Sequence, residues 1–391
     1  MDSNVQALVE LIRVPGEAGK EKLIGERIEK LLREMGVPAE NILSDRAHEL
    51  SEYGGERGNM IVRFPGRGEG QHRMLTTHMD TVPGAVGSEP RLDGKRIVND
   101  AEGRALGGDA RCGVTVLLAA ARALVEKKGD HPPRTLCFFV QEEVGLVGSQ
   151  HLDVSMLGEP LPAMCFNFDG GDVEQIANRV IGTERMNVNL TGVAVHTGKA
   201  GKGINCALIF AEALAEIGRD GWFGEVRRDG GWATSNVGVI RGGTGSNVTM
   251  PELYALAECR SFDYDFRCRV LDAWRAAFRS AVERANAAAE QRGVEGRASV
   301  TFSQGPEYRP YALTADHPAV LAAKRAVAGT GRKPVLFDHA GGMDTCNLVS
   351  KGIPAVGMGM GDRAAHSVEE WVDVPHFLDA CKVAVELATG D

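Results

Sequence analysis

The sequence lacks the patterns that mark membrane proteins and nucleic-acid-binding proteins. No apolar run approaches the length that spans a bilayer. The first residues, Met1-Asp2-Ser3-Asn4-Val5, do not have the basic and then apolar order of a signal peptide. Lysine and arginine form no basic block, and the formal net charge is -9. We therefore expect a protein that binds neither nucleic acid nor a membrane.

Cysteine is present, but in no pattern that binds metal or forms disulfides. The eight cysteines include no C-x-x-C pair. Several lie in apolar runs, such as Cys137 in Leu136-Cys-Phe-Phe-Val140. Buried, reduced thiols are the expected state of such residues, and a reducing compartment preserves them. The sequence therefore predicts a cytoplasmic protein.

Strands alternate with helices in the first part of the chain. Buried-looking strands are expected at 60–64, 73–78, 135–140 and 163–168. A long helix rich in alanine and leucine is expected near 112–127. This α/β alternation predicts a mostly parallel sheet that is covered by helices on both faces.

The order of elements changes near residue 183. From 183 to 308 we expect a strand, a helix, two strands, a long helix and a strand, which is the order of a ferredoxin-like α+β unit. The α/β alternation returns after that segment. A chain of 391 residues is also too long for one simple core. The sequence therefore predicts a catalytic domain made of 1–182 and 309–391, interrupted by an inserted domain at 183–308.

Polar residues stand at the ends of the strands expected in the α/β domain, or in the loops that follow them. They are His78, Asp80, Asp109, Glu142, Glu143, Asp169 and His366. The carboxyl ends of strands in an open α/β sheet line the ligand crevice, so residues far apart in sequence can meet there. Imidazole and carboxylate together suit zinc, and mixed nitrogen and oxygen ligands suit a catalytic site.

The charges of these residues fit two metal ions. Asp109, Glu143 and Asp169 supply three negative charges, and one hydroxide ion makes four, which balances two divalent cations. One bridging carboxylate and two terminal ligands for each ion would use five residues: His78, Asp109, Glu143, Asp169 and His366.

Two carboxylates remain for other roles. Asp80 lies two residues beyond His78, so in an extended chain it would accept a hydrogen bond from the His78 ring. Glu142 adjoins a ligand and must point elsewhere, which suits a general base that acts on water. Taken singly, a His-x-Asp or an adjacent Glu pair is more often a solvated loop feature.

Five motifs together resemble the metal-site motifs of the aminoacylase, carboxypeptidase and peptidase T family of dizinc peptidases, in that family's order. They are Thr77-His-Met-Asp-Thr-Val82, Leu106-Gly-Gly-Asp-Ala-Arg-Cys-Gly113, Gln141-Glu-Glu-Val-Gly145, Phe168-Asp-Gly-Gly171 and His366-Ser-Val-Glu-Glu370. Asp169-Gly-Gly171 and Ala340-Gly-Gly-Met-Asp344 are most similar to the peptidase T branch.

The resemblance implies a zinc-exopeptidase-type α/β/α catalytic domain with an inserted lid that also forms a homodimer contact. It implies one ion held by His78, Asp109 and Asp169, and a second held by Asp109, Glu143 and His366. Asp109 would then bridge the two ions, which would be Zn²⁺, with Co²⁺ or Mn²⁺ as alternatives. Glu142 would be the base, and Asp80 would orient His78.

The resemblance also implies roles for residues outside the metal site. His196, in Val195-His-Thr-Gly198 of the lid, would stabilise the oxyanion, often in the partner's active site. Asn247 and Arg260 would hold the carboxylate end of the substrate. His339 precedes Ala-Gly-Gly, where peptidase T has an arginine, in the loop expected to line the substrate pocket.

Three functions follow, of which one is preferred. Asp169, the shorter acidic residue, resembles the ligand of aminopeptidases and dipeptidases, so we expect removal of the N-terminal residue from short peptides. An N-acyl-amino-acid deacylase or carboxypeptidase-like amidohydrolase would use the same metals with a different pocket. A metal-binding scaffold without catalysis is disfavoured, because Glu142 and Asp80 are both present.

Overall fold

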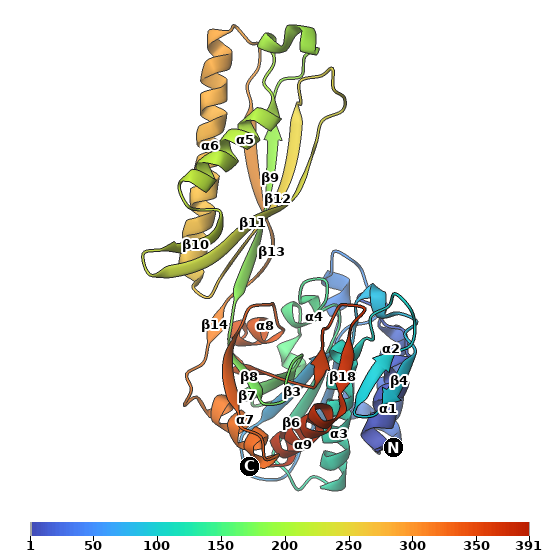
Figure 1. Ribbon diagram of the computed structural model, residues 1–391. Helices are drawn as coiled ribbons and strands as arrows, with labels where there is room; N and C mark the ends of the chain where they lie inside the picture. Colours follow the sequence, from blue (N-terminus) through green and yellow to red (C-terminus); the bar gives the residue numbers. More distant parts are fainter. Residues whose placement is uncertain (1, 391) are drawn as a thin grey trace. The chain divides into compact units, whose positions relative to one another are not determined.

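The computed structural model describes residues 2–390, apart from the side chain of Pro306. The chain forms two units (Figure 1). Unit 1 contains Met1–Val180 and Ala312–Asp391, and unit 2 is the continuous segment Ile181–Tyr311. The ends of unit 2 lie two or three residues outside the expected insertion at 183–308. No helix among the described residues has the length and apolar character needed to cross a bilayer.

Unit 1 is built around a mixed sheet of nine described strands in the order β1-β2-β6-β3-β7-β16-β8-β14, with β15 paired to β8. The strands are β1 (Ile42–Ser44), β2 (Met60–Phe64), β3 (Arg73–His78), β6 (Arg134–Phe139), β7 (Met164–Phe168), β8 (Gln175–Val180), β14 (Tyr311–Ala312), β15 (Val335–His339) and β16 (Ala355–Met358). The central strands β6, β3, β7 and β16 are parallel. Their carboxyl ends therefore meet at one edge.

Alternating side chains of the central strands pack into two different cores, because successive residues of a strand face opposite sides of the sheet. Leu75 and Leu136 belong to the larger core, whereas Met74 and Cys137 belong to the smaller one. Helices cover both faces. They are α1 (Ser3–Ile12), α2 (Lys22–Glu34), α3 (Gly108–Glu126), α7 (Pro318–Gly329) and α9 (Val374–Thr389) over the larger core, and α8 (Thr345–Ser350) over the smaller, with α4 (Val147–Gln150) beside α8. The predicted α/β class is confirmed.

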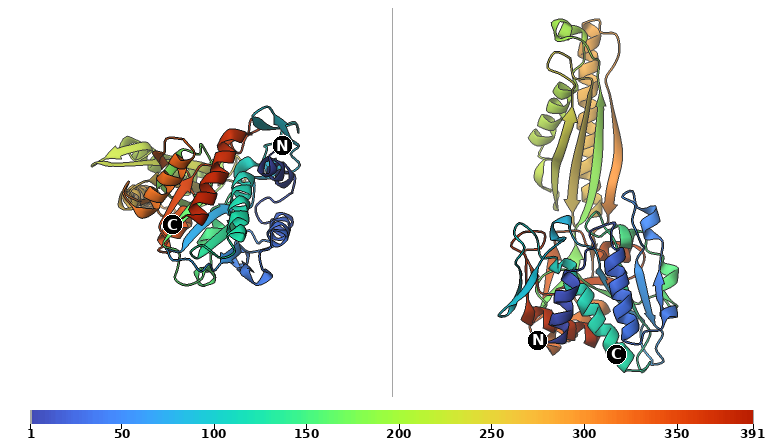
Figure 2. Two further views of the ribbon diagram at one scale, coloured as in Figure 1. Left: turned by 90° about the horizontal axis from the view of Figure 1, so that it is seen from below. Right: turned by 90° about the vertical axis from the view of Figure 1, so that its right-hand side faces the viewer.

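A second sheet of unit 1 joins early and late parts of the chain. Its order is β17-β18-β5-β4. The strands are β4 (Pro90–Asp93), β5 (Arg96–Asn99), β17 (Asp362–Arg363) and β18 (Trp371–Asp373). Helices α3 and α9 likewise lie side by side although about 250 residues separate them (Figure 2). Unit 1 therefore needs both of its segments to fold.

Unit 2 is a five-stranded antiparallel sheet in the order β10-β11-β12-β9-β13, with two helices packed against it. Its elements are β9 (Gly182–Thr191), α5 (Cys206–Arg219), β10 (Gly224–Arg228), β11 (Gly231–Gly242), β12 (Glu252–Ser261), α6 (Tyr264–Gln291) and β13 (Ser299–Tyr308). Strand β10 is an addition to the expected ferredoxin-like order. It is joined to β11 by Asp229-Gly230, whose φ values of 51° and 77° suit a two-residue hairpin turn.

The C-terminal helix α9 is fixed to the sheet by two buried arginines. Arg134 donates from Nε to the Ala388 carbonyl at 2.6 Å and from Nη2 to the Gly390 carbonyl at 2.7 Å. Arg73 donates to the Leu387 carbonyl at 3.2 Å. The last carbonyls of a helix have no partner within the helix, so these guanidinium groups satisfy acceptors that would otherwise be buried alone.

We expect Arg134→Met to destabilise unit 1 by about 3 kcal/mol, because it removes the guanidinium donor of the Ala388 and Gln71 carbonyls and half of the donors of Gly390. The measurement is the urea midpoint of unfolding. Arg67→Met is the matched control, since Arg67 is exposed and its guanidinium donates to the Lys128 carbonyl at 3.0 Å. The control is expected to change stability by less than about 0.5 kcal/mol. Equal midpoints for the two variants would contradict the role given to Arg134.

Candidate metal centre

The structure brings the five predicted ligand residues together at the carboxyl edge of the unit 1 sheet. They form two trios, each with ligand atoms within 4.8 Å of one another. One trio contains His78, Asp109 and Asp169, and the other contains Asp109, Glu143 and His366. The two trios share Asp109, as the family resemblance implied. Their role as metal ligands stays a prediction.

The shared carboxylate faces one imidazole with each of its oxygens. His78 Nε2 lies 2.9 Å from Asp109 Oδ1, and His366 Nε2 lies 3.3 Å from Asp109 Oδ2. The outer carboxylates complete the trios, with His78 Nε2 at 3.5 Å from Asp169 Oδ1 and His366 Nε2 at 2.9 Å from Glu143 Oε1. Each trio thus presents one nitrogen and two carboxylates, a donor set that fits a divalent cation such as zinc.

The carboxylates strongly favour protons on both imidazoles. Hydrogen bonds to Asp109 and Glu143 raise the pKa of His366 to about 10. Burial lowers the pKa of His78, but hydrogen bonds to Asp109, Asp169 and Asp80 outweigh it and hold that pKa well above its usual value. The site is therefore rich enough in negative charge to require positive charge, whether from protons or from metal ions.

Asp109 is positioned by a turn that a distant acid holds in place. Gly107 has a left-handed φ of 82° and precedes α3, and the Asp109-Ala110 peptide is cis. The buried carboxylate of Glu370 accepts the Gly107 N–H at 2.7 Å and the Asp109 N–H at 3.1 Å. Glu370 follows His366 by four residues, so one segment supplies a predicted ligand and fixes the main chain of another.

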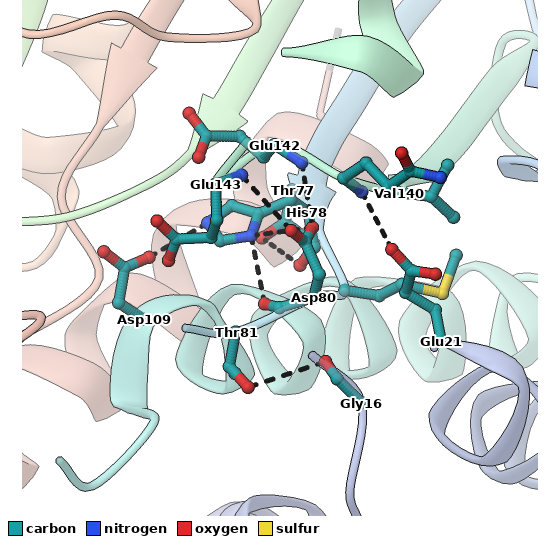
Figure 3. A network of polar contacts seen from close by, with 12 residues as sticks. Gly16, Glu21, Thr77, His78, Asp80, Thr81, Asp109, Val140, Glu142 and Glu143 are labelled. Atoms are coloured by element: carbon teal, nitrogen blue, oxygen red, sulfur yellow. Dashed lines mark hydrogen bonds and ion pairs between the residues drawn. The ribbon is translucent and has the colours of Figure 1, made fainter. Parts of the chain in front are cut away.

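The turn that carries Glu142 and Glu143 is held by Asp80 (Figure 3). The fully buried Asp80 accepts the Glu142 N–H at 3.1 Å and the Glu143 N–H at 3.2 Å. Its contact with the His78 ring differs from the expectation, because His78 Nδ1 lies nearer the Asp80 main-chain carbonyl, at 3.1 Å, than the carboxylate, at 3.4 Å. Asp80 therefore contacts both a predicted ligand and the turn of the predicted base.

Glu142 and Glu143 carry their carboxyl groups to the same side of the turn (Figure 3), and ligand atoms of both lie within 4.8 Å of one another and of the His78 ring. Glu143 reaches His366, whereas no hydrogen bond ties the Glu142 carboxyl to the trios among the contacts of the described residues. Burial raises the pKa of Glu142 well above its usual range, and repulsion from Asp169 adds to the effect. A carboxylate with a raised pKa is a better proton acceptor, which suits a general base.

Besides Asp80 and Glu142, four predicted residues lie outside the trios. His339 ends β15 in unit 1, and burial lowers its pKa although Asp169 and Asp109 oppose the shift. His196, Asn247 and Arg260 belong to unit 2. There His196 is exposed, so it is not a histidine of the core. The Asn247 carbonyl accepts the N–H of Thr197, the residue that follows His196, at 2.9 Å. Arg260 lies on β12, where its Nε pairs with Glu258 at 2.6 Å.

Sequence reasoning missed several buried acids behind the trios. They are Glu21, Asp344, Asp362 and Glu370. Asp362 accepts the N–H of Gly171, two residues beyond Asp169, at 3.0 Å. Burial, with repulsion from Asp169, raises the pKa of Asp344 to about 7. Asp344 and Glu370 are the last residues of two motifs quoted above, and Asp362 follows a run of glycine and methionine, where a solvated acid is not expected.

Comparison with known proteins finds similar folds over nearly the whole chain. The aminopeptidase PepT from Bacillus cereus superposes with a TM-score of 0.82 at 27% identity, covering 98% of this chain and 96% of that chain. A tripeptidase from Staphylococcus aureus has a TM-score of 0.83 at 22% identity with the same coverage. The Bacillus subtilis protein YqjE is 24% identical over 387 residues, which is 98% of this chain and 96% of that protein.

Residues 74–390 match the peptidase family M20/M25/M40, which covers most of the chain. The predicted family and the type of fold are thereby confirmed, and the chain is similar in structure to an aminopeptidase PepT and a tripeptidase. So is the prediction of an enzyme, since members of this family are hydrolases that use divalent metal ions. The chain therefore belongs to peptidase family M20/M25/M40.

Proposed function

We propose that this peptidase removes the N-terminal residue from di- and tripeptides, with two zinc ions as cofactor. The observation that carries the proposal is the carboxylate of Asp109, whose two oxygens face the imidazoles of His78 and His366. A carboxylate in this position fits a bridge between two cations. The free-amine preference rests on Asp169 and on the similarity to an aminopeptidase PepT.

In this proposal, His78, Asp109 and Asp169 would hold one ion, and Asp109, Glu143 and His366 would hold the other. When bound, the two ions supply Lewis-acid activation of water and of the scissile carbonyl. Asp80 keeps the His78 ring in its orientation through the contacts to Nδ1. Glu142 takes the proton from the attacking water and delivers it to the leaving amine, so the base is restored in each cycle.

The residues of unit 2 are assigned to the substrate and the oxyanion. His196 donates a hydrogen bond to the oxyanion that develops on the carbonyl, from the same or the partner subunit. Asn247 and Arg260 bind the peptide's terminal carboxylate, which would limit the length of the substrate. His339 lines the pocket in unit 1.

We further propose that unit 2 serves as lid and homodimer contact. Helices α5 and α6 cover one face of its sheet, and side chains such as Asn187, Tyr254 and Leu256 on the alternate face stay partly exposed. A cytoplasmic location is supported by the cysteines, all eight of which are free and seven of which are buried.

Zinc affinity is expected to rise with pH between about pH 6 and about pH 9. The pKa of His366 is about 10 and that of His78 is raised, so below those values zinc must displace a proton from each ring. The same imidazolium–carboxylate pairs stabilise the metal-free protein fully below about pH 6.5, and this stability is lost as the pH rises toward 10.

Calorimetric titration in buffers of different ionisation heat measures the protons released on zinc binding. We expect about two protons per chain near neutral pH, and about one for His366→Asn, which also loses one ion. Zinc affinity that does not change across this pH range would contradict protonated ligands.

Glu142→Gln is expected to keep both zinc ions and to lose turnover. The amide preserves the shape of the side chain but cannot take a proton, so kcat should fall by about 10²–10⁴-fold or more. Metal analysis and kcat are measured on the same sample, with Glu369→Gln, an exposed acid, as the control. A Glu142→Gln enzyme with wild-type kcat would exclude the general base.

A substrate panel tests the bond that is cleaved. The zinc-loaded enzyme is offered free and N-acetylated di- and tripeptides, and products are identified by mass spectrometry. We expect release of the N-terminal residue from free peptides, with most activity lost on N-acetylation, because the free amine is part of what the pocket recognises. Faster cleavage of N-acetylated amino acids than of free tripeptides would favour the deacylase function instead.

A further inference from the structure

Glu21, near the start of unit 1, contacts the turn at residues 141–143 that carries the proposed base, Glu142. It directly precedes α2 and is fully buried, yet its side chain does not cap that helix. Instead Oε1 accepts the main-chain N–H of Gln141 at 3.0 Å, across 120 residues, and that of Gly19 at 2.8 Å. The loop that carries it is anchored beside Asp80, because the Gly16 carbonyl accepts the Thr81 N–H at 3.0 Å and the Thr81 hydroxyl at 3.5 Å, the second of which Figure 3 shows.

Glu21 and Asp80 together hold three consecutive main-chain donors. The N–H of Gln141 goes to Glu21, and those of Glu142 and Glu143 go to the two oxygens of Asp80. These hydrogen bonds fix both the residue that precedes the base and the base itself.

Gln141 is the residue whose conformation sets the direction of this turn. Its φ of 54° is left-handed, a conformation that a non-glycine residue keeps only where its surroundings hold it there. Its side chain is held as well, with Oε1 accepting from the Ser51 hydroxyl at 2.6 Å and Nε2 donating to the Gly54 carbonyl at 2.8 Å. The main-chain N–H of Gln141 is held separately, with the Glu21 carboxyl as its acceptor.

The surroundings of Glu21 favour its neutral form. Burial raises its pKa to about 7, and repulsion from Asp80 adds to the effect. The charges of Arg111 and Arg57 also act on Glu21, but the Arg111 guanidinium donates to main-chain carbonyls, of Met79 and Val14. The second oxygen, Oε2, is buried without a hydrogen-bond partner among the residues described. A glutamine amide would therefore reproduce what the wild-type side chain offers to the turn.

We propose that Glu21 is a positioning residue of the peptidase: by accepting the Gln141 N–H, it fixes the turn from which Glu142 reaches the substrate. The inference rests on the proposed role of Glu142 as the base. Glu21 itself lies behind the turn, on the side of α2, and acts only through Gln141. No local motif marks it, since its contact spans most of the first segment of unit 1.

Two substitutions with side chains as long as glutamate distinguish the role of the acceptor oxygen from that of the side chain's volume. Glu21→Gln keeps an oxygen for the Gln141 N–H, whereas Glu21→Met fills the buried space without an acceptor. We expect Glu21→Gln to have kcat within about threefold of wild type, and Glu21→Met to lose about tenfold or more, since small misplacement of a catalytic group costs up to about 10²-fold. KM and zinc content should stay unchanged in both.

Amide hydrogen exchange of residues 141–143 gives a readout that does not depend on activity. Loss of the acceptor should speed exchange at Gln141 in Glu21→Met and leave it slow in Glu21→Gln. Glu26→Met, on the exposed side of α2, is the matched control and should change neither exchange nor kcat. If Glu21→Met does not fold, Glu21→Asp, which shortens the acceptor by one methylene, replaces it with the same expected outcome.

Wild-type kcat and slow exchange in Glu21→Met would overturn the inference, and so would a Glu21→Gln variant as impaired as Glu21→Met. A drop in thermal stability alone, with kcat per folded enzyme unchanged, would also overturn it in favour of a structural role. If the wild-type enzyme cleaves no peptide, or Glu142→Gln stays active, the proposed function fails instead. Exchange at Gln141 then still decides whether Glu21 holds the turn.

Discussion

Repulsion between carboxylates at the carboxyl edge of the nine-stranded sheet determines how the surrounding loops are built. Asp109, Glu143 and Asp169 share two imidazoles, and burial raises the pKa of Glu142 next to them. Such a cluster would disperse if it stood on mobile loops, because like charges in a region of low dielectric repel strongly. It is held together by main-chain hydrogen bonds that fix each loop from behind.

The buried acids behind the trios each fix a loop by accepting its main-chain N–H groups. Glu370 accepts N–H groups around Asp109, Asp80 accepts those of Glu142 and Glu143, and Asp362 accepts that of Gly171. Their partners are 62 to 263 residues away in sequence. Because Asp362 and Glu370 come from the last segment, the first segment alone cannot complete the site, and unit 2 could be inserted only where both segments still meet.

The sequence was informative where side-chain chemistry coincides with strand ends. His78 ends β3 and Asp169 follows β7, so one rule about the carboxyl edge was enough to group them with Asp109. The chain was less informative about β10, although Asp229-Gly230 is a typical hairpin turn. It could not reveal Glu21, because a contact from a side chain to a distant main-chain N–H leaves no periodicity and no motif in the sequence.

The hydrogen bonds of the protonated site also prepare it for metal. Each oxygen of Asp109 already faces one imidazole, and the outer carboxylates already complete the two trios. If these side chains hold a cation, as we propose, much of their conformational entropy has been lost on folding rather than on binding. In the proposed function the buried acids would raise metal affinity indirectly, because they hold together carboxylates that repel one another.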